Sequence, residues 1–105
     1  MAEPTRGRLR AVDTAPVTGE ESWHVATVAG VVVEQILSGR LDAPVDYLAD
    51  VDEWVVVLAG RAVLEVAGAS LELRAGDWVM LPAQTPHRLV ETDASTNWIT
   101  VAGRV

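Results

Sequence analysis

The chain has 105 residues, 50% of them hydrophobic, which is enough for one domain around one core. Its eight arginines, 15 acidic residues and formal net charge of −7 disfavour nucleic acid and anionic membranes as partners. The absence of cysteine excludes a disulfide framework and a thiolate metal site, and no apolar run is near the roughly 20 residues that span a bilayer.

The first 30 residues read as an N-terminal arm and a short helix. Residues 1–17 mix Arg, Pro, Thr and Gly without a helical period, which is typical of a solvated tail or of an arm lying along the domain. An alternative is that Arg6, Arg8 and Arg10 mark an edge strand that pairs in a dimer. Thr18 and Glu21 have the spacing of a capping box, so we predict a helix from about Gly19 to Ala29.

Short apolar runs separated by Gly turns and Pro dominate the rest of the chain. Val31–Leu37 is the first secure strand, and four more runs follow at 54–58, 62–66, 71–74 and 78–81, with a last one at 98–102. This pattern predicts an all-β, antiparallel sandwich or barrel over residues 31–105.

The strand that starts at Glu53 is apolar on both faces. Side chains alternate between the faces of a strand, so Val55 and Val57 share a face with Glu53, whereas Trp54, Val56 and Leu58 lie opposite. Both faces must then be covered. We therefore expect a homodimer that buries the row of Trp54, Val56 and Leu58.

Five carboxylates lie between Asp42 and Glu53, the densest charge in the chain. Their spacing does not match a calcium loop, so we read the segment as a solvated acidic loop at the mouth of a cavity. Tyr47, within this segment, is expected to form part of the cavity wall and to donate a hydrogen bond from its hydroxyl to a ligand.

Two motifs in the second half of the chain resemble those of a known family. Glu53, six residues and Gly60 resemble the second half of the first cupin motif, and Gly76, five residues, Pro82 and then His87 resemble the second. The chain therefore looks like a small single-domain bacterial cupin. The resemblance implies a double-stranded β-helix, or jelly-roll barrel, with Glu53 and His87 pointing into one cavity.

The family's metal ligands are matched only in part. The two histidines that precede the motif glutamate in the family fall on Tyr47 and Ala49, or on Asp46 and Leu48, depending on the gap. The resemblance leaves Glu53 and His87 as metal ligands, with Gln84 as the third in our prediction. Tyr47 and Glu91 are further candidates for that third position, whereas His24 is better read as a solvated or structural histidine.

Three hypotheses for the cavity remain open at this point. In the first, a divalent transition metal (Fe, Mn, Ni, Zn or Cu) supports oxygenase, isomerase or lyase chemistry of the cupin type on a small organic molecule. In the second, Glu53 and His87 act without metal as general base and general acid, with Tyr47 as a third catalytic candidate. In the third, the barrel binds a small ligand without catalysis. The sequence has no Gly-rich phosphate loop, so no nucleotide cofactor is expected, and we expect a cytoplasmic protein.

Overall fold

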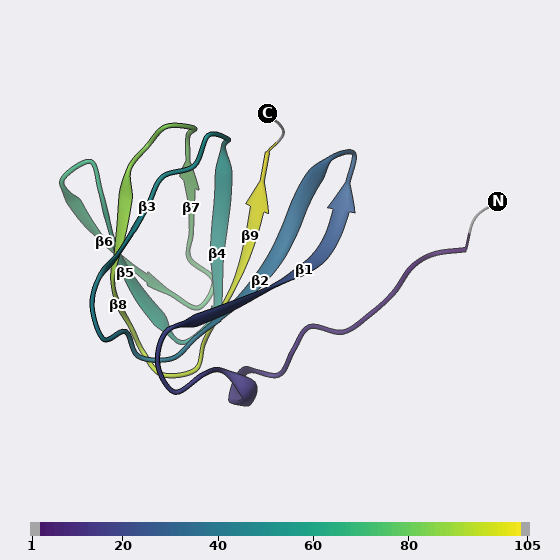
Figure 1. Cartoon of the computed structure of the whole chain (residues 1–105), viewed down its shortest axis with the longest axis horizontal. Coiled ribbons are helices and arrows are strands. Elements are labelled where there is room, and N and C mark those ends of the chain that lie inside the picture. Colours follow the sequence, from purple (N-terminus) through teal and green to yellow (C-terminus); the bar gives the residue numbers. More distant parts are fainter. Residues whose placement is uncertain (1–2, 104–105) are drawn as a thin grey trace.

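The protein folds into two antiparallel sheets that face each other, as Figure 1 shows. The computed structural model describes residues 3–103. One sheet has the order β1-β2-β9-β4-β7 and the other β3-β8-β5-β6. The strands within the described residues are β1 (Glu20–Val28), β2 (Val31–Ser38), β3 (Val45–Tyr47), β4 (Glu53–Ala59), β5 (Arg61–Val66), β6 (Ala69–Arg74), β7 (Trp78–Leu81), β8 (His87–Thr92) and β9 (Thr96–Ala102). The all-β, antiparallel prediction is confirmed.

The helix predicted over Gly19–Ala29 is wrong, because this segment forms strand β1. It pairs with β2 from Glu20↔Ser38 to Val28↔Val31, with a bulge between His24 and Ala26. The β-branched residues Val25, Thr27 and Val28 favour a strand, and the whole length of β2 is available as a partner. Tertiary pairing thus overrides the local capping pattern, and the first sheet extends across residue 30.

The core lies between the inner faces of the two sheets. Six strands from the two sheets contribute side chains that are at most 5% exposed: Val55, Val57, Ala62, Leu64, Leu73, Leu81, Leu89 and Trp98. Val55 and Val57 point inward together with Glu53, as the alternation along β4 predicts. Burial of Val55 and Val57 therefore keeps the Glu53 side chain, at the start of β4, on the inner face of the sheet.

The outer face of the five-stranded sheet divides into a covered and an uncovered part. Over β1 and β2 the N-terminal arm covers it: the Arg10 backbone N–H donates to Gln35 Oε1 at 2.8 Å, and Gln35 Nε2 donates to the Arg10 carbonyl at 3.0 Å. Val12–Thr14 form a short 3-10 helix (η1). Over β4 and β7 the face is apolar and open, with Trp78 60% and Met80 46% exposed.

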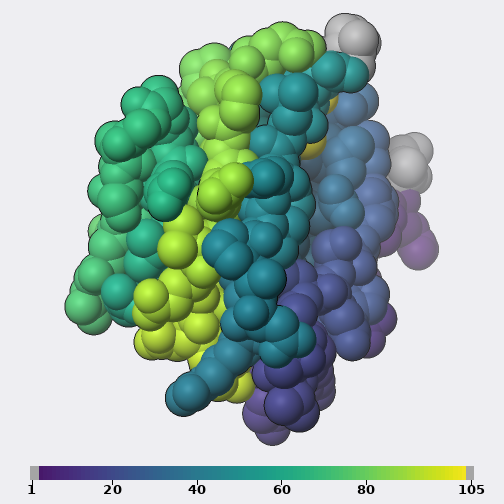
Figure 2. All heavy atoms as spheres, turned by 60° about the vertical axis from the view of Figure 1, so that its left-hand side comes forward, coloured from purple at the N-terminus to yellow at the C-terminus, as the bar shows by residue number. Residues whose placement is uncertain are grey.

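Segment 39–52, which contains β3, lies along the side of the barrel between the two sheets. Figure 2 shows it in blue-green beside the yellow-green of β8 and the blue of β1 and β2. β3 pairs with β8 through Tyr47↔His87 and is an edge strand of its sheet. Among the described residues, no helix has the length and apolar character needed to cross a membrane.

A bulge in β8 changes which of its residues face inward. Leu89 is opposite Leu64 on β5 and Glu91 is opposite Val63, so Val90 is an extra residue in the pairing. An extra residue shifts every later side chain to the other face. Glu91 consequently points outward, whereas Thr92 is buried and donates a hydrogen bond to the Gly39 carbonyl at 2.6 Å.

Candidate functional site

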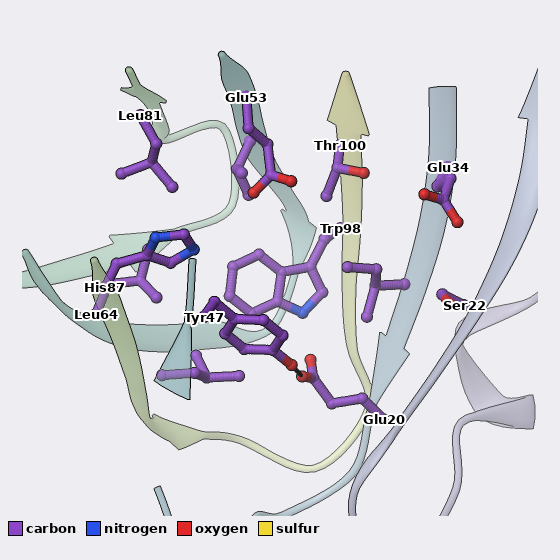
Figure 3. A pocket seen from close by; sticks show the side chains of 13 residues that line it. Glu20, Ser22, Glu34, Tyr47, Glu53, Leu64, Leu81, His87, Trp98 and Thr100 are labelled. Carbon is purple, nitrogen blue, oxygen red and sulfur yellow. Dashed lines mark hydrogen bonds between the residues drawn. The ribbon is translucent and has the colours of Figure 1, made fainter. Parts of the chain in front are cut away.

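A cavity of about 140 Å³ opens between the two sheets on the side of β3. Its walls are mostly apolar, and its polar groups come from strands of both sheets. Figure 3 shows the lining side chains, which are Glu20, Ser22, Glu34, Ile36, Tyr47, Glu53, Val55, Leu64, Leu81, His87, Leu89, Trp98 and Thr100. The sequence-predicted residues Glu53, His87 and Tyr47 meet here, although they come from three different strands.

Glu53, the first residue of β4, is half-buried among apolar neighbours. This burial raises the pKa of its carboxyl; the His87 imidazole lowers it, and the Glu34 carboxylate raises it, with a net upward shift. No hydrogen bond or ion pair within residues 3–103 engages the Glu53 side chain. Its carboxyl is therefore free to accept a proton from, or donate one to, a molecule in the cavity.

His87 begins β8 and is 8% exposed. Its Nδ1 lies 3.0 Å from the Thr85 carbonyl oxygen, which can only accept, so Nδ1 carries the proton. In the neutral ring, Nε2 then holds the lone pair. The approach to His87 contains Pro82 and Pro86, which fix φ and stiffen the loop. The ring is thus held in one orientation and one tautomer.

Tyr47 stacks on His87 and connects the two sheets. The ring centroids are 5.7 Å apart and the planes differ by 17°. The Tyr47 hydroxyl donates to Glu20 Oε1 at 2.5 Å, so it is engaged by the protein rather than directed at a ligand. Burial raises the pKa of the Tyr47 phenol far above its usual range, and the Glu20 carboxylate raises it further. Tyr47 is held as a neutral aromatic wall.

The hydrogen-bond chain continues from Glu20 into the core. Ser38 Oγ donates to Glu20 Oε2 at 2.6 Å, and Trp98 Nε1 donates to Ser38 Oγ at 2.9 Å. Because its indole N–H is engaged in this way, the Trp98 ring is fixed where it lines the cavity (Figure 3). The chain links β9, β2, β1 and β3 around one side of the pocket.

The remaining candidate ligands lie away from the cavity. Gln84 is exposed at φ 62° and donates from Nε2 to Asp50 Oδ1 at 2.8 Å. Glu91 pairs with Arg61 at 2.7 Å on the outer surface, because the bulge at Val90 reverses its direction. His24 is exposed on β1 and contacts the Thr27 hydroxyl at 2.7 Å. The structure does not bring any of the three to Glu53 and His87.

Five polar or aromatic pocket residues were not among the candidates from the sequence: Glu20, Ser22, Glu34, Trp98 and Thr100. Glu34 carried a readable signal, since it is a charged residue within an otherwise apolar strand. Glu20 was hidden by the helix prediction. Trp98 and Thr100 gave no signal of their own, because both are ordinary residues of an apolar strand.

Comparison with known proteins identifies the family. The model of the cupin domain matches residues 32–102, about two thirds of the chain. The chain is a cupin. A solved structure from Ralstonia eutropha JMP134, described as a putative mannose-6-phosphate isomerase, is 32% identical and covers 97% of this chain and 100% of its own, with a TM-score of 0.79. No curated protein gives a significant match.

Two more distant structures share the cupin fold. KdgF from a Halomonas species is 21% identical, with a TM-score of 0.69, and covers 83% of this chain and 82% of its own. A cupin superfamily protein from Desulfitobacterium hafniense DCB-2 is 17% identical, with a TM-score of 0.74, and covers 94% and 92%. The predicted cupin barrel is thereby confirmed.

The donor set of this cupin does not fit the divalent metal that is frequent in the family. Of the candidate ligands, Glu53, His87 and Tyr47 line the cavity, and the Tyr47 hydroxyl is already bonded to Glu20. Within residues 3–103, no group of three or more His, Cys, Asp or Glu side chains is arranged to hold a metal ion. Two protein ligands bind a divalent ion weakly, since closed and catalytic sites commonly use three or four.

Proposed function

We propose that this cupin binds a small organic molecule in the cavity and exchanges protons with it through Glu53 as general base and His87 as general acid. The observation that supports the proposal is that Glu53 and His87 line the same cavity. A carboxyl with a raised pKa lies in the same apolar cavity as a buried imidazole whose Nδ1 is already bonded. Groups with shifted pKa values in a cavity are typical of acid–base sites.

Each of the two residues has the group that its role requires. An ionised Glu53 accepts a proton from the bound molecule, and apolar walls strengthen it as a base because less water solvates the carboxylate. A protonated His87 donates from Nε2, since Nδ1–H remains on the Thr85 carbonyl throughout. Tyr47 holds the imidazole ring by stacking and takes no part in the transfer.

The general base is tested with 5-nitrobenzisoxazole, a neutral aromatic probe that opens to a coloured phenolate when a base removes its carbon-bound proton. We expect the wild type to exceed Glu53→Gln by at least about tenfold in rate. Glu65→Gln, which changes an exposed glutamate on β5, is the matched control. The rate should rise with pH through a pKa above the usual glutamate range, because Glu53 must lose its proton. Equal rates for wild type and Glu53→Gln contradict the proposal.

The general acid is tested by comparing two probes. The nitrophenolate leaving group needs little protonation, whereas the oxygen that leaves from unsubstituted benzisoxazole needs more. His87→Asn should therefore slow the unsubstituted probe more than the nitro compound. The predicted divalent metal gives a different outcome: activity lost on treatment with chelator and restored by Zn²⁺ or Mn²⁺ would replace acid–base chemistry by metal chemistry. Tight binding without proton transfer would favour a non-catalytic barrel.

We also propose that the cupin assembles as a homodimer through the outer face of the five-stranded sheet. Rows of apolar side chains cross this face without interruption, because Trp54 is opposite Val101 and Met80, and Val56 is opposite Ile99 and Trp78. The Trp54 and Trp78 rings lie 6.1 Å apart. Specific interfaces bury about 1,200–2,000 Å² in total. The cytoplasmic location, and the absence of nucleic-acid or membrane partners, stay predictions from the sequence.

A further inference from the structure

The cavity has an acidic end at which two carboxylates have no partner. Glu34 on β2 and Glu53 on β4 both line the cavity, on either side of Thr100 on β9. Figure 3 shows the three side chains along one edge of the pocket, above the Trp98 ring. No described residue donates a hydrogen bond to Glu34 or Glu53, and neither forms an ion pair with residues 3–103.

Thr100 points to a ligand independently of these carboxylates. It is 7% exposed, it lines the cavity, and its hydroxyl has no hydrogen-bond partner among the described residues. No buried side-chain N or O atom within residues 3–103 lacks a partner, so the Thr100 hydroxyl oxygen is exposed to the cavity. By contrast, the neighbouring buried threonines Thr92 and Thr96 both donate to backbone carbonyls, at 2.6 Å and 2.8 Å. The hydroxyl of Thr100 is therefore available to whatever occupies the cavity.

The cavity also lacks a permanent positive charge, since His87 is the one basic side chain among its lining residues. The chain contains no lysine, and no arginine is among the residues that line this pocket. The arginines with identified partners make their contacts outside the cavity. Arg61 and Arg74 form ion pairs with Glu72. Arg88 forms an ion pair with Asp46, and Arg10 lies 4.1 Å from the centre of the Trp23 ring. An anionic ligand, such as a sugar phosphate, would meet the two carboxylates and no lysine or arginine that could neutralise its charge.

We infer that the ligand of this pocket is a small organic amine, bound as its ammonium ion between Glu34 and Glu53, with its apolar part against Trp98 and Tyr47. The inference rests on the proposed function only in taking this cavity as the ligand site. The ammonium group supplies the donors that the two carboxylates and the Thr100 oxygen lack. The aromatic walls attract a cation through their ring faces.

The size of the cavity limits the amine. A cavity of about 150 Å³ holds a ligand as large as benzene, and this one has about 140 Å³. The part of the amine inside the cavity is therefore one ring or a short branched chain, and a larger molecule such as the benzisoxazole probe would extend through the open side beside β3. The lining disfavours the phosphate group named in the description of the Ralstonia structure, so these two cupins are expected to differ in substrate class although they share 32% of their residues.

Three probes of equal size and different charge test the inference: benzylamine, benzyl alcohol and benzoate. At pH 7.5, calorimetry on the full chain should give benzylamine a dissociation constant at least about tenfold lower than that of benzyl alcohol, with benzoate weakest. Glu34→Gln should remove most of this preference, because it should weaken the binding of benzylamine much more than the binding of benzyl alcohol. Glu65→Gln, exposed on β5, is the control, and an unchanged melting temperature shows that both variants fold.

Several outcomes overturn the inference. The inference fails if benzylamine and benzyl alcohol bind equally, or if benzoate binds more tightly than either. It also fails if no probe binds at about 10 mM, a concentration at which even weak fragments bind. Stoichiometric binding of Zn²⁺ that displaces benzylamine assigns the carboxylates to a metal instead. A preference for benzylamine that survives Glu34→Gln also refutes the proposed position of the ammonium. The benzisoxazole assay on the same wild-type protein reports the acid–base function separately, so the two proposals fail by different measurements.

Discussion

The turn at Gly60 gives a stability prediction whose size follows from the structure. Gly60 has φ 85°, and a Cβ at this position would lie 2.5 Å from Thr96 Oγ1 and 2.7 Å from Thr96 Cα. Thr96 is fully buried and its hydroxyl donates to the Asp93 carbonyl at 2.8 Å, so it cannot move without breaking that bond. We expect Gly60→Ala to lower the free energy of unfolding by about 2–5 kcal/mol, from about 1–2 for the backbone and about 1–3 for the clash.

Gly68 is a matched control, because its φ is 80° and a Cβ there would have no atom within 4 Å. Gly68→Ala should therefore cost only the backbone part, about 1–2 kcal/mol. Urea unfolding of both variants, followed by tryptophan fluorescence, measures the difference directly. Equal losses would mean that contact with Thr96 contributes nothing, and the account of Gly60 as a close-packed turn would have to be abandoned.

Three more predictions concern the surface and the pocket. Trp78→Glu should convert the proposed dimer to a monomer of about 11 kDa in sedimentation, whereas Val28→Glu, at the far end of the sheet, should leave the dimer intact; a wild-type monomer at micromolar concentration rules the dimer out. Because folding raises the pKa of Glu53, stability should fall as pH rises from the ordinary glutamate pKa through the raised one, and Glu53→Gln should remove this loss in urea titrations at several pH values. Tyr47 is the single tyrosine, so absorbance at 295 nm should show its ionisation only well above the usual pKa, and Glu20→Gln should reduce that shift; a normal titration contradicts the Glu20 contact.

The strands of the second half could be predicted because alternation and Gly turns both mark them. Trp54–Leu58 and Trp78–Leu81 appear in the structure within one residue of the predicted bounds. The helix at Gly19–Ala29 could not be rejected from local sequence, since a capping pattern says nothing about a partner strand. What decides that segment is pairing with β2, which is a tertiary interaction.

The pocket was predictable in part for the same reason. Glu53 and His87 lie on motifs, and alternation along β4 places Glu53 inward. Glu91 was a candidate because it has the same parity as His87 along β8, but the bulge at Val90, which the local sequence does not indicate, turns it outward. Thr100 and Trp98 become pocket residues only once β9 is paired between β2 and β4. The sequence of one strand does not show which strands pair with it, and that pairing decides which side chains share a pocket.

The short edge strand β3 has a kinetic consequence for the pocket. β3 has three residues and pairs only with β8, and Tyr47 at its end is 41% exposed. Short, exposed segments open locally at a much lower free energy than the central strands. Tyr47 can therefore leave the pocket when β3 separates and its hydrogen bond to Glu20 breaks, while the core between the sheets stays closed. We therefore expect the rates at which a ligand arrives and departs to depend on the opening of β3, and to change by mutation in segment 39–52 without any change in the residues that contact the ligand.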